Sequence, residues 1–220
     1  MAYDRDFFED VYAEGDGDSW GYFESDYERR KAERPLAALR DRRPPGTVER
    51  IVDLGCGNGA KTAHLVEAYP DAEVVGVDLS AEALAVAREE VPGATFEQAD
   101  MVEWVEDAAA EGSVDAVYAV GALHYLCAQE SVTDLLAVAD DLREALAPDG
   151  LLVAAHNHMP RGGGPTFVQE RSVATLRTVL ETAFETVGRA RYDAEKTTAL
   201  DPDEPASQPY EVWAMEPSER

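Results

Sequence analysis

From Val48 onward, short apolar runs alternate with longer amphipathic runs, and this alternation limits the possible folds more than any other feature. The strand-like runs are ERIVDLG, EVVGVDL, ATFEQAD, VDAVYAV and LLVAAHN, and the clearest helical runs are AEALAVAREE, VTDLLAVADDLREAL and SVATLRTVLETAF. Strands separated by helices of this length form βαβ units. We therefore predict a doubly wound α/β domain, with a mostly parallel sheet and helices on both faces.

Two β-rich runs, ETVGRARYD and QPYEVWAMEP, follow the last helical run. They are interpreted as a terminal hairpin whose final strand is antiparallel on the sheet. Residues 1–43 are aromatic and charged and contain two helical stretches, the second of which ends before Pro44 and Pro45 because prolines cannot continue a helix. The predicted organisation is an N-terminal helical cap and linker over residues 1–47 and a main domain over residues 48–220.

The composition restricts the partners. The chain has 45 acidic and 19 basic residues, a net charge of -26, yet 45% hydrophobic residues, which is enough for a full core. An acidic surface with far more arginine than lysine resembles proteins of halophiles that accumulate salt. No basic stripe is present, which argues against nucleic-acid binding.

Because no signal segment or membrane-length apolar run occurs, we expect a soluble, cytoplasmic protein without membrane contact. The oligomeric state is not predicted.

A glycine-rich stretch follows the first strand. Gly55, Gly57 and Gly59 leave the backbone bare where a ligand must approach closely. The GxGxG spacing, with Ala60 in the sixth position, does not choose between a dinucleotide and another adenosine ligand. Asp53, just ahead of the turn, would repel a pyrophosphate and suits a ligand with a sulfonium or ammonium group.

Carboxylates recur at the next two strand ends. Asp78 can accept hydrogen bonds from both hydroxyls of a ribose, although it could instead cap the following helix. Asp100 is placed to accept from an exocyclic amine such as that of adenine, and Met101 to cover the ring. The alternative for Asp100 is again a helix N-cap.

The runs VDLGCGNG, VGVDLS, FEQAD, DAVYAVGALHYL and LREALAPDGLLV resemble, in order and spacing, the motifs of class I S-adenosylmethionine-dependent methyltransferases. The resemblance covers roughly Glu49 to Asn157. It implies a seven-stranded sheet with an antiparallel last strand, and S-adenosyl-L-methionine as the cofactor. The predicted cofactor-binding residues of the main domain are Asp53, Gly55, Cys56, Gly57, Gly59, Asp78, Leu79, Asp100 and Met101.

The segment YAEGDGDSWGYFESDYERRK is similar to the one preceding the core in nodulation protein S type N-methyltransferases, with Ser19 in place of the family's proline. In that family the segment folds over the cofactor as a lid. The resemblance implies cofactor contacts by Trp20, Tyr27 and Arg30, with Arg30 directed at the methionine carboxylate. These residues could also anchor the cap or pair with nearby carboxylates.

Histidines follow the fourth and fifth strands. His124 and His156 are predicted catalytic residues, because a general base is needed if the nucleophile carries a proton. His158 is close by, but no third ligand has suitable spacing, so no metal is predicted. Cys56 and Cys127 form no CxxC motif and are expected to be small buried side chains.

The acceptor class follows from missing motifs. The fourth strand lacks the Asp/Asn-Pro-Pro-Tyr/Phe sequence that grips a flipped base, and no Pro-Cys nucleophile occurs. We predict an enzyme that methylates a small molecule, with an amine as one candidate, by in-line displacement that depends mainly on proximity and orientation. The alternatives are a non-catalytic S-adenosylmethionine-binding protein and an NAD-dependent oxidoreductase. The acceptor, the methylated atom and the use of a base stay open.

Overall fold

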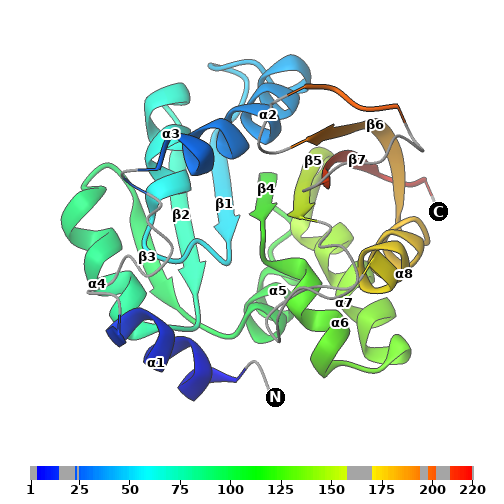
Figure 1. Ribbon diagram of the computed structural model, residues 1–220. Helices are drawn as coiled ribbons and strands as arrows, with labels where there is room; N and C mark the ends of the chain where they lie inside the picture. The colour runs from blue at the N-terminus through cyan, green and yellow to red at the C-terminus, as the bar shows by residue number, and fades with distance from the viewer. Residues whose placement is uncertain are drawn as a thin grey trace.

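Seven strands form a single sheet in the computed structural model, which describes residues 4–14, 23, 25–157, 170–193, 198–201 and 209–219 (Figure 1). The strand order is β3-β2-β1-β4-β5-β7-β6. The bounds of the strands are β1 Arg50–Leu54, β2 Glu73–Asp78, β3 Thr95–Gln98, β4 Val114–Val120, β5 Leu146–Asn157, β6 Phe184–Asp193 and β7 Pro209–Pro217.

The direction of the strands confirms the predicted fold class. Strands β1 to β5 pair in parallel, whereas β7 pairs antiparallel with both β5 and β6. The last strand of the sequence is therefore the antiparallel one, as predicted. It lies between β5 and β6, so β6 takes the edge of the sheet.

Helices cover both faces of the sheet (Figure 1). Helices α2 and α3 contribute to a core cluster on one face, and α5, α7 and α8 contribute to a larger cluster on the other. The described helices are α1 Arg5–Glu14, α2 Asp26–Arg42, α3 Ala60–Ala68, α4 Ala81–Glu90, α5 Met101–Ala109, the 3-10 turn η1 Leu123–Tyr125, α6 Leu126–Gln129, α7 Val132–Ala145 and α8 Glu170–Leu180. None of the helices among the described residues is long and apolar enough to cross a membrane.

Burial on both faces explains the apolar strands. In β1, Ile51 belongs to the core cluster under α2 and α3, while Val52 and Leu54 belong to the cluster on the other face. Because successive side chains of a strand point to opposite faces, a strand covered on both sides reads as a continuous apolar run. Asp53 is the buried polar exception within β1.

Helix α2 packs firmly on the sheet. Its N-cap Ser25 accepts a hydrogen bond from the Glu28 amide at 3.3 Å, and Leu39 is fully buried. The Tyr118 hydroxyl in β4 donates to the Ala32 carbonyl at 3.3 Å, so the helix is tied to the middle of the sheet. The division of the chain at residue 47 stays a prediction, but this part of the predicted cap is buried against the main domain.

The strand order creates a switch point between β1 and β4. From β1 the chain proceeds outward to β2 and β3, and from β4 it proceeds in the opposite direction to β5. Ligands of doubly wound sheets bind outside the carboxyl ends of the strands at such a point. The expected position of a ligand site is therefore at the ends of β1, β2, β3 and β4.

Candidate functional site

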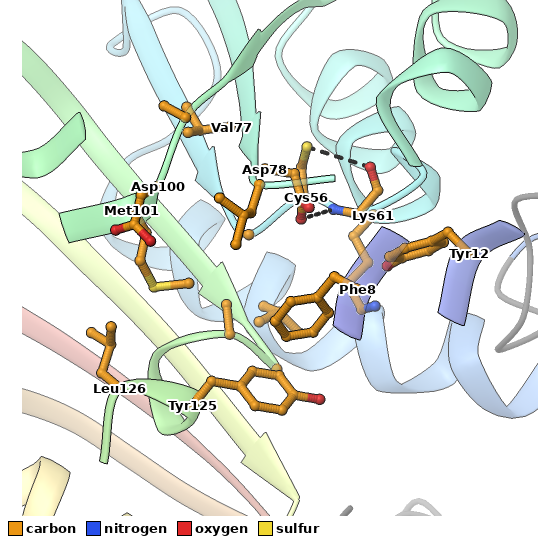
Figure 2. Close-up of a pocket in the computed structure, with 17 residues that line it drawn as sticks. Phe8, Tyr12, Cys56, Lys61, Val77, Asp78, Asp100, Met101, Tyr125 and Leu126 are labelled. Atoms are coloured by element: carbon orange, nitrogen blue, oxygen red, sulfur yellow. Dashed lines mark hydrogen bonds between the residues drawn. The ribbon is translucent and has the colours of Figure 1, made fainter. Parts of the chain in front are cut away.

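A pocket lies at the carboxyl edge of the sheet, at the switch point (Figure 2). Its wall is built from the loops that follow β1, β2, β3 and β4, and from one face of α1. The lining residues are Phe8, Tyr12, Gly55, Cys56, Gly57, Lys61, Val77, Asp78, Leu79, Ala99, Asp100, Met101, Val120, Gly121, Ala122, Tyr125 and Leu126.

The turn after β1 needs its glycines for two reasons. Gly55, Gly57 and Gly59 all have positive φ angles, of 75°, 56° and 82°, which side chains other than that of glycine rarely allow. A Cβ on Gly55 would also stand 2.4 Å from the Ala122 Cβ, and one on Gly57 would stand 2.4 Å from the Tyr12 hydroxyl. The turn is thus packed between the β4 loop and α1, and it presents bare backbone to the pocket.

Asp78 ends β2 and reaches the turn. Its Oδ2 accepts a hydrogen bond from the Gly57 amide at 2.8 Å, drawn as a dashed line in Figure 2, and its Oδ1 accepts from the Ser80 amide at 3.0 Å. Burial raises the pKa of Asp78 above its ordinary value; the amides of Ser80 and Gly57 oppose this shift, and the charge of Glu9 adds to it. Ser80, and not Asp78, provides the side-chain cap of α4.

The residues after β3 form the opposite side of the pocket from Lys61 and Tyr12 in Figure 2. Asp100 lines the pocket and also caps α5, since its Oδ1 accepts from the Val102 amide at 2.8 Å. Met101 and Leu79 add apolar surface to the pocket. The N-cap alternative for Asp100 is therefore confirmed. Its predicted contact with an adenine amine stays a prediction, which the cap does not prevent, because one carboxylate has enough acceptor positions for a helix amide and a ligand.

Asp53 lies behind the glycine turn and not among the residues that line the pocket. Its side chain is 1% exposed, and its Oδ2 accepts a hydrogen bond from the Thr62 hydroxyl at 2.7 Å. Burial raises the pKa of Asp53 from 3.8 to about 6. The Thr62 hydrogen bond and the charge of Lys61 act in the opposite direction and limit this rise. Its predicted attraction for a ligand cation stays a prediction.

The raised pKa of Asp53 gives a testable pH dependence. The folded protein holds the proton of Asp53 more tightly than the unfolded chain does. The protonated carboxyl therefore contributes its full stability below about pH 3.8, and this contribution is lost as the pH rises through about 6. An asparagine cannot lose a proton. We expect the melting temperature of Asp53→Asn, relative to the native protein, to rise between pH 4 and 6 and then level off.

Thermal unfolding monitored by circular dichroism at constant salt measures this difference. The matched control is Asp71→Asn, which removes an exposed carboxylate from the surface. The control should differ from the native protein by the same amount at every pH in the range. An Asp53→Asn difference as flat as that of the control would contradict the assignment.

Helix α1 supplies pocket residues that sequence reasoning missed. Phe8 and Tyr12 are four residues apart and share one helix face, which is the face that lines the pocket. Phe8 makes an edge contact with the Tyr125 ring, with centroids 5.2 Å apart. In the sequence these aromatics have helical spacing, but that spacing does not indicate what the helix covers.

Glu9 attaches α1 to α4. Its carboxylate accepts hydrogen bonds from the Ser80 hydroxyl at 2.8 Å, the Ala81 amide at 2.9 Å and the Glu82 amide at 3.1 Å. Burial alone would raise the pKa of Glu9, but these three donors, together with the charge of Arg5, hold the pKa below its ordinary value.

Lys61 and the β4 loop complete the list of missed pocket residues. Lys61 is in the first turn of α3, and Figure 2 shows its side chain extending towards Phe8 and Tyr12. Val77, Ala99, Tyr125, Leu126 and residues 120–122 also line the pocket. Among the described residues, Lys61 is the only pocket-lining side chain with a positive charge.

His124 and His156 lie together behind the pocket wall. Their Nδ1 atoms are 3.4 Å apart, and the two side chains are 9% and 0% exposed. Burial lowers the pKa of His124 to about 3, so this ring is neutral near pH 7. The His124 ring rests against Tyr125, with centroids 4.1 Å apart, whereas neither histidine lines the pocket. Their predicted catalytic role stays a prediction.

The structure describes only some of the three cap residues that are predicted to contact the cofactor. Trp20 lies outside the described residues, as does the side chain of Tyr27, whose backbone is in α2. Arg30 is half-buried in α2, and its buried Nε has no hydrogen-bond partner among the described residues. Their contacts with a cofactor therefore stay predictions.

Cys56 is buried within the turn, and its predicted character as a small apolar side chain fits the structure. Burial, and then the charges of Asp78 and Asp53, raise the pKa of its thiol well above the ordinary value. Cys127 is partly buried and packs against the larger core cluster. Within the described part of the chain, no three His, Cys, Asp or Glu side chains are grouped to hold a metal ion.

Sequence comparisons agree with this geometry. Residues 52–152 match a family model described as a methyltransferase domain. A trans-aconitate 2-methyltransferase of Methylobacterium nodulans is 36% identical over 170 residues, which are 76% of this chain and 62% of that protein. That of Variovorax paradoxus is 39% identical over 119 residues, or 54% of this chain and 42% of that protein. The chain thus spans less than two thirds of the length of these curated relatives.

Comparisons with solved structures extend over more of the chain. The N-methyltransferase NodS from Bradyrhizobium japonicum, in complex with S-adenosyl-l-homocysteine, superposes with a TM-score of 0.69 and 19% identity, over 98% of both chains. A TehB-like SAM-dependent methyltransferase from Corynebacterium glutamicum gives a TM-score of 0.62 and 18% identity, over 97% of this chain and all of that one. At such identities the likeness establishes the fold, including the helices that precede β1.

Proposed function

We propose that this protein, a class I S-adenosylmethionine-dependent methyltransferase by its domain and its fold, transfers a methyl group from S-adenosyl-L-methionine to a small-molecule acceptor. The proposal rests on the pocket at the switch point, which is lined by two carboxylates that follow neighbouring strands and by a bare glycine turn. When bound, S-adenosylmethionine supplies an electrophilic methyl group on a sulfonium sulfur.

The pocket residues fit this cofactor. Asp78 and Asp100 offer acceptor oxygens for ribose hydroxyls and for the adenine amine, while Leu79 and Met101 offer apolar contacts for the base. Gly121 lines the same pocket with a φ of 78°, and a Cβ there would meet no atom within 4 Å. A side chain at this position would therefore fill space that a ligand can use.

One hydrogen bond argues against the dinucleotide alternative. In a dinucleotide site, the amides of the glycine turn and of the helix start face a pyrophosphate. Here the Gly57 amide donates to Asp78, which places a carboxylate where a pyrophosphate would need to approach. The alternative of an NAD-dependent oxidoreductase is therefore disfavoured by charge.

As the first acceptor to test, we put forward a small carboxylate such as trans-aconitate. The relatives that carry this name are 34 to 39% identical to the matched parts of the chain. A carboxylate is already deprotonated at neutral pH, so its methylation needs no general base. An amine would first have to lose a proton, and His124, with a pKa of about 3, is a weak base for that step.

For His124 and His156 we propose an indirect role. The pair connects η1 to β5 and supports Tyr125, whose ring lies between His124 and Phe8. Such support would hold one wall of the pocket in place, which serves a reaction that depends on orientation. Trp20, Tyr27 and Arg30 are retained as proposed contacts of the cap with the cofactor.

The test is turnover by the full chain. We expect S-adenosylhomocysteine to accumulate when S-adenosylmethionine and trans-aconitate are supplied together, measured by chromatography with mass detection, and not when either is omitted. Because the protein carries a net charge of -26, an anionic acceptor should react faster as salt screens the repulsion, whereas a cationic amine should not.

Each failure has a distinct meaning. Turnover with a panel of primary amines, but not with trans-aconitate, would replace the carboxylate with the amine acceptor. Tight binding of S-adenosylhomocysteine without turnover of any acceptor would favour the non-catalytic alternative. Binding of NAD without binding of S-adenosylhomocysteine would overturn the proposed function.

A further inference from the structure

The first turn of α4 has an unusual capping arrangement. In an α-helix the first amides have no partner within the helix. Here the Ala83 amide donates to the Ser80 hydroxyl at 3.1 Å, as in an ordinary N-cap. The Ala81 and Glu82 amides instead donate to Glu9, a residue of another helix more than 70 positions earlier. The cap of α4 is complete only while α1 lies against it.

The same contact connects α1 to the ligand side of the pocket. The Ser80 hydroxyl donates to Glu9, the Ser80 amide donates to Asp78, and the Gly57 amide donates to Asp78. Glu9 is therefore two hydrogen bonds away from the carboxylate at the end of β2. The charge of Glu9 also acts on Asp78, as it contributes to the raised pKa of that group.

Docked in this way, α1 bridges the pocket. Glu9 holds it to the start of α4, while its neighbour Phe8 contacts Tyr125 on the β4 loop. Tyr12, on the face shared with Phe8, packs over Gly57. Figure 1 shows α1 next to α4, at the carboxyl ends of β2 and β3. A ligand beneath Phe8 and Tyr12 is enclosed as long as α1 stays in place.

The energetics suit a reversible contact. The hydrogen bonds from Ala81 and Glu82 lie at the surface, where water can replace Glu9 as the acceptor. A hydrogen bond to a charged group is stronger than one between neutral groups, but solvent exposure reduces its contribution. The first turn of a helix favours a negative charge, which makes the Glu9 carboxylate a suitable partner for the start of α4. The contact between Glu9 and α4 is therefore specific but reversible.

We propose that Glu9 is a positioning residue that holds α1 over the occupied pocket and thereby sets the rate at which the bound nucleoside leaves. The inference rests on the proposed function in its choice of ligand. We infer in addition that capping of α4 and closure of the pocket occur together. The pocket opens when Glu9 releases the Ala81 and Glu82 amides.

The test compares two variants of the full chain. Glu9→Gln keeps the length of the side chain, but its amide nitrogen cannot accept from a backbone amide. Asp10→Asn removes the same charge from the next, exposed position of α1 and is the matched control. We expect Glu9→Gln to release S-adenosylhomocysteine roughly tenfold faster in stopped-flow displacement, which corresponds to about 1.4 kcal/mol. Asp10→Asn should behave as the native protein does.

Amide hydrogen exchange supplies a readout that needs no ligand. Glutamine keeps one acceptor oxygen, so in Glu9→Gln at least one of the amides of Ala81 and Glu82 should exchange faster than in Asp10→Asn. If the native protein binds no S-adenosylhomocysteine but this difference in exchange is seen, the proposed function fails and the Glu9 contact stands. Equal exchange and equal release rates in the two variants would overturn the inference.

Steady-state kinetics of the same two variants distinguish a positioning role of Glu9 from a role in the chemical step. Glu9→Gln should raise the KM for S-adenosylmethionine without lowering kcat, since the reacting groups are untouched and release is faster. A variant that lost kcat and kept its KM would show that Glu9 acts on the chemical step instead, contrary to the proposal.

Discussion

Replacing Asp78 with alanine is expected to weaken binding of S-adenosylhomocysteine by at least about a hundredfold while leaving the fold intact. The carboxylate is the proposed acceptor for two ribose hydroxyls, and hydrogen bonds to a charged group are worth about 1.5–3 kcal/mol each. It also accepts from the Gly57 and Ser80 amides, so the variant loosens the glycine turn from β2. Isothermal calorimetry of the native and variant proteins measures the loss.

Stability should respond less than binding does. Burial raises the pKa of Asp78, so its charged form is costly to keep in the folded protein, and removing it relieves that cost while losing two hydrogen bonds. Circular dichroism and urea unfolding should therefore give a folded variant close to the native protein. Glu89→Ala, an exposed change on α4, is the control and should bind normally. Native affinity in Asp78→Ala would remove Asp78 from the cofactor site.

Replacing Gly55 with alanine is expected to have the largest effect on stability. The positive φ of 75° costs a side chain roughly 1–2 kcal/mol. The added Cβ would also lie 2.4 Å from the Ala122 Cβ, which forces the β4 loop away from the turn. Overpacking of this kind costs about 1–3 kcal/mol more, so the total is roughly 2–5 kcal/mol. Urea unfolding followed by circular dichroism measures the free energy.

Gly46 provides a control that isolates the packing contribution. Its φ is 85°, close to that of Gly55, but a Cβ there would meet no atom within 4 Å. Gly46→Ala should therefore lose only the conformational cost, roughly 1–2 kcal/mol. If the two variants lose the same stability, the contact between the turn and Ala122 is not the reason that Gly55 is a glycine.

Much of the fold was predictable because its signals are local. Strand β1 is a run of apolar residues that is buried on both faces, and such a run is recognisable without knowing its neighbours. Asp78 was found for the same reason: in a parallel sheet, a polar residue at the end of a strand is placed at the ligand edge by the topology alone. The antiparallel final strand also followed from the adjacent hairpin of β6 and β7.

Other parts of the candidate site had no local signal. Asp53 stands two positions before the first of the glycines, yet its side chain faces Thr62 and lies behind the turn, because successive residues of a strand point to opposite sides. Lys61 gave no sign of its place in the pocket, since one lysine near the start of a helix is common on any surface. His124 and His156 are 32 residues apart, and only the pairing of β4 with β5 brings their rings together.

The sequence by itself determined the alternation of strands and helices, the bare turn and the carboxylates at the strand ends, because each of these depends on residues that are near neighbours in the chain. The tertiary structure alone decided what closes the pocket. Glu9 meets Ser80, and Phe8 meets Tyr125, across 71 and more than 100 residues. Contacts at such separations depend on how the whole chain packs, and no spacing of residue types encodes which side chain a surface helix will meet.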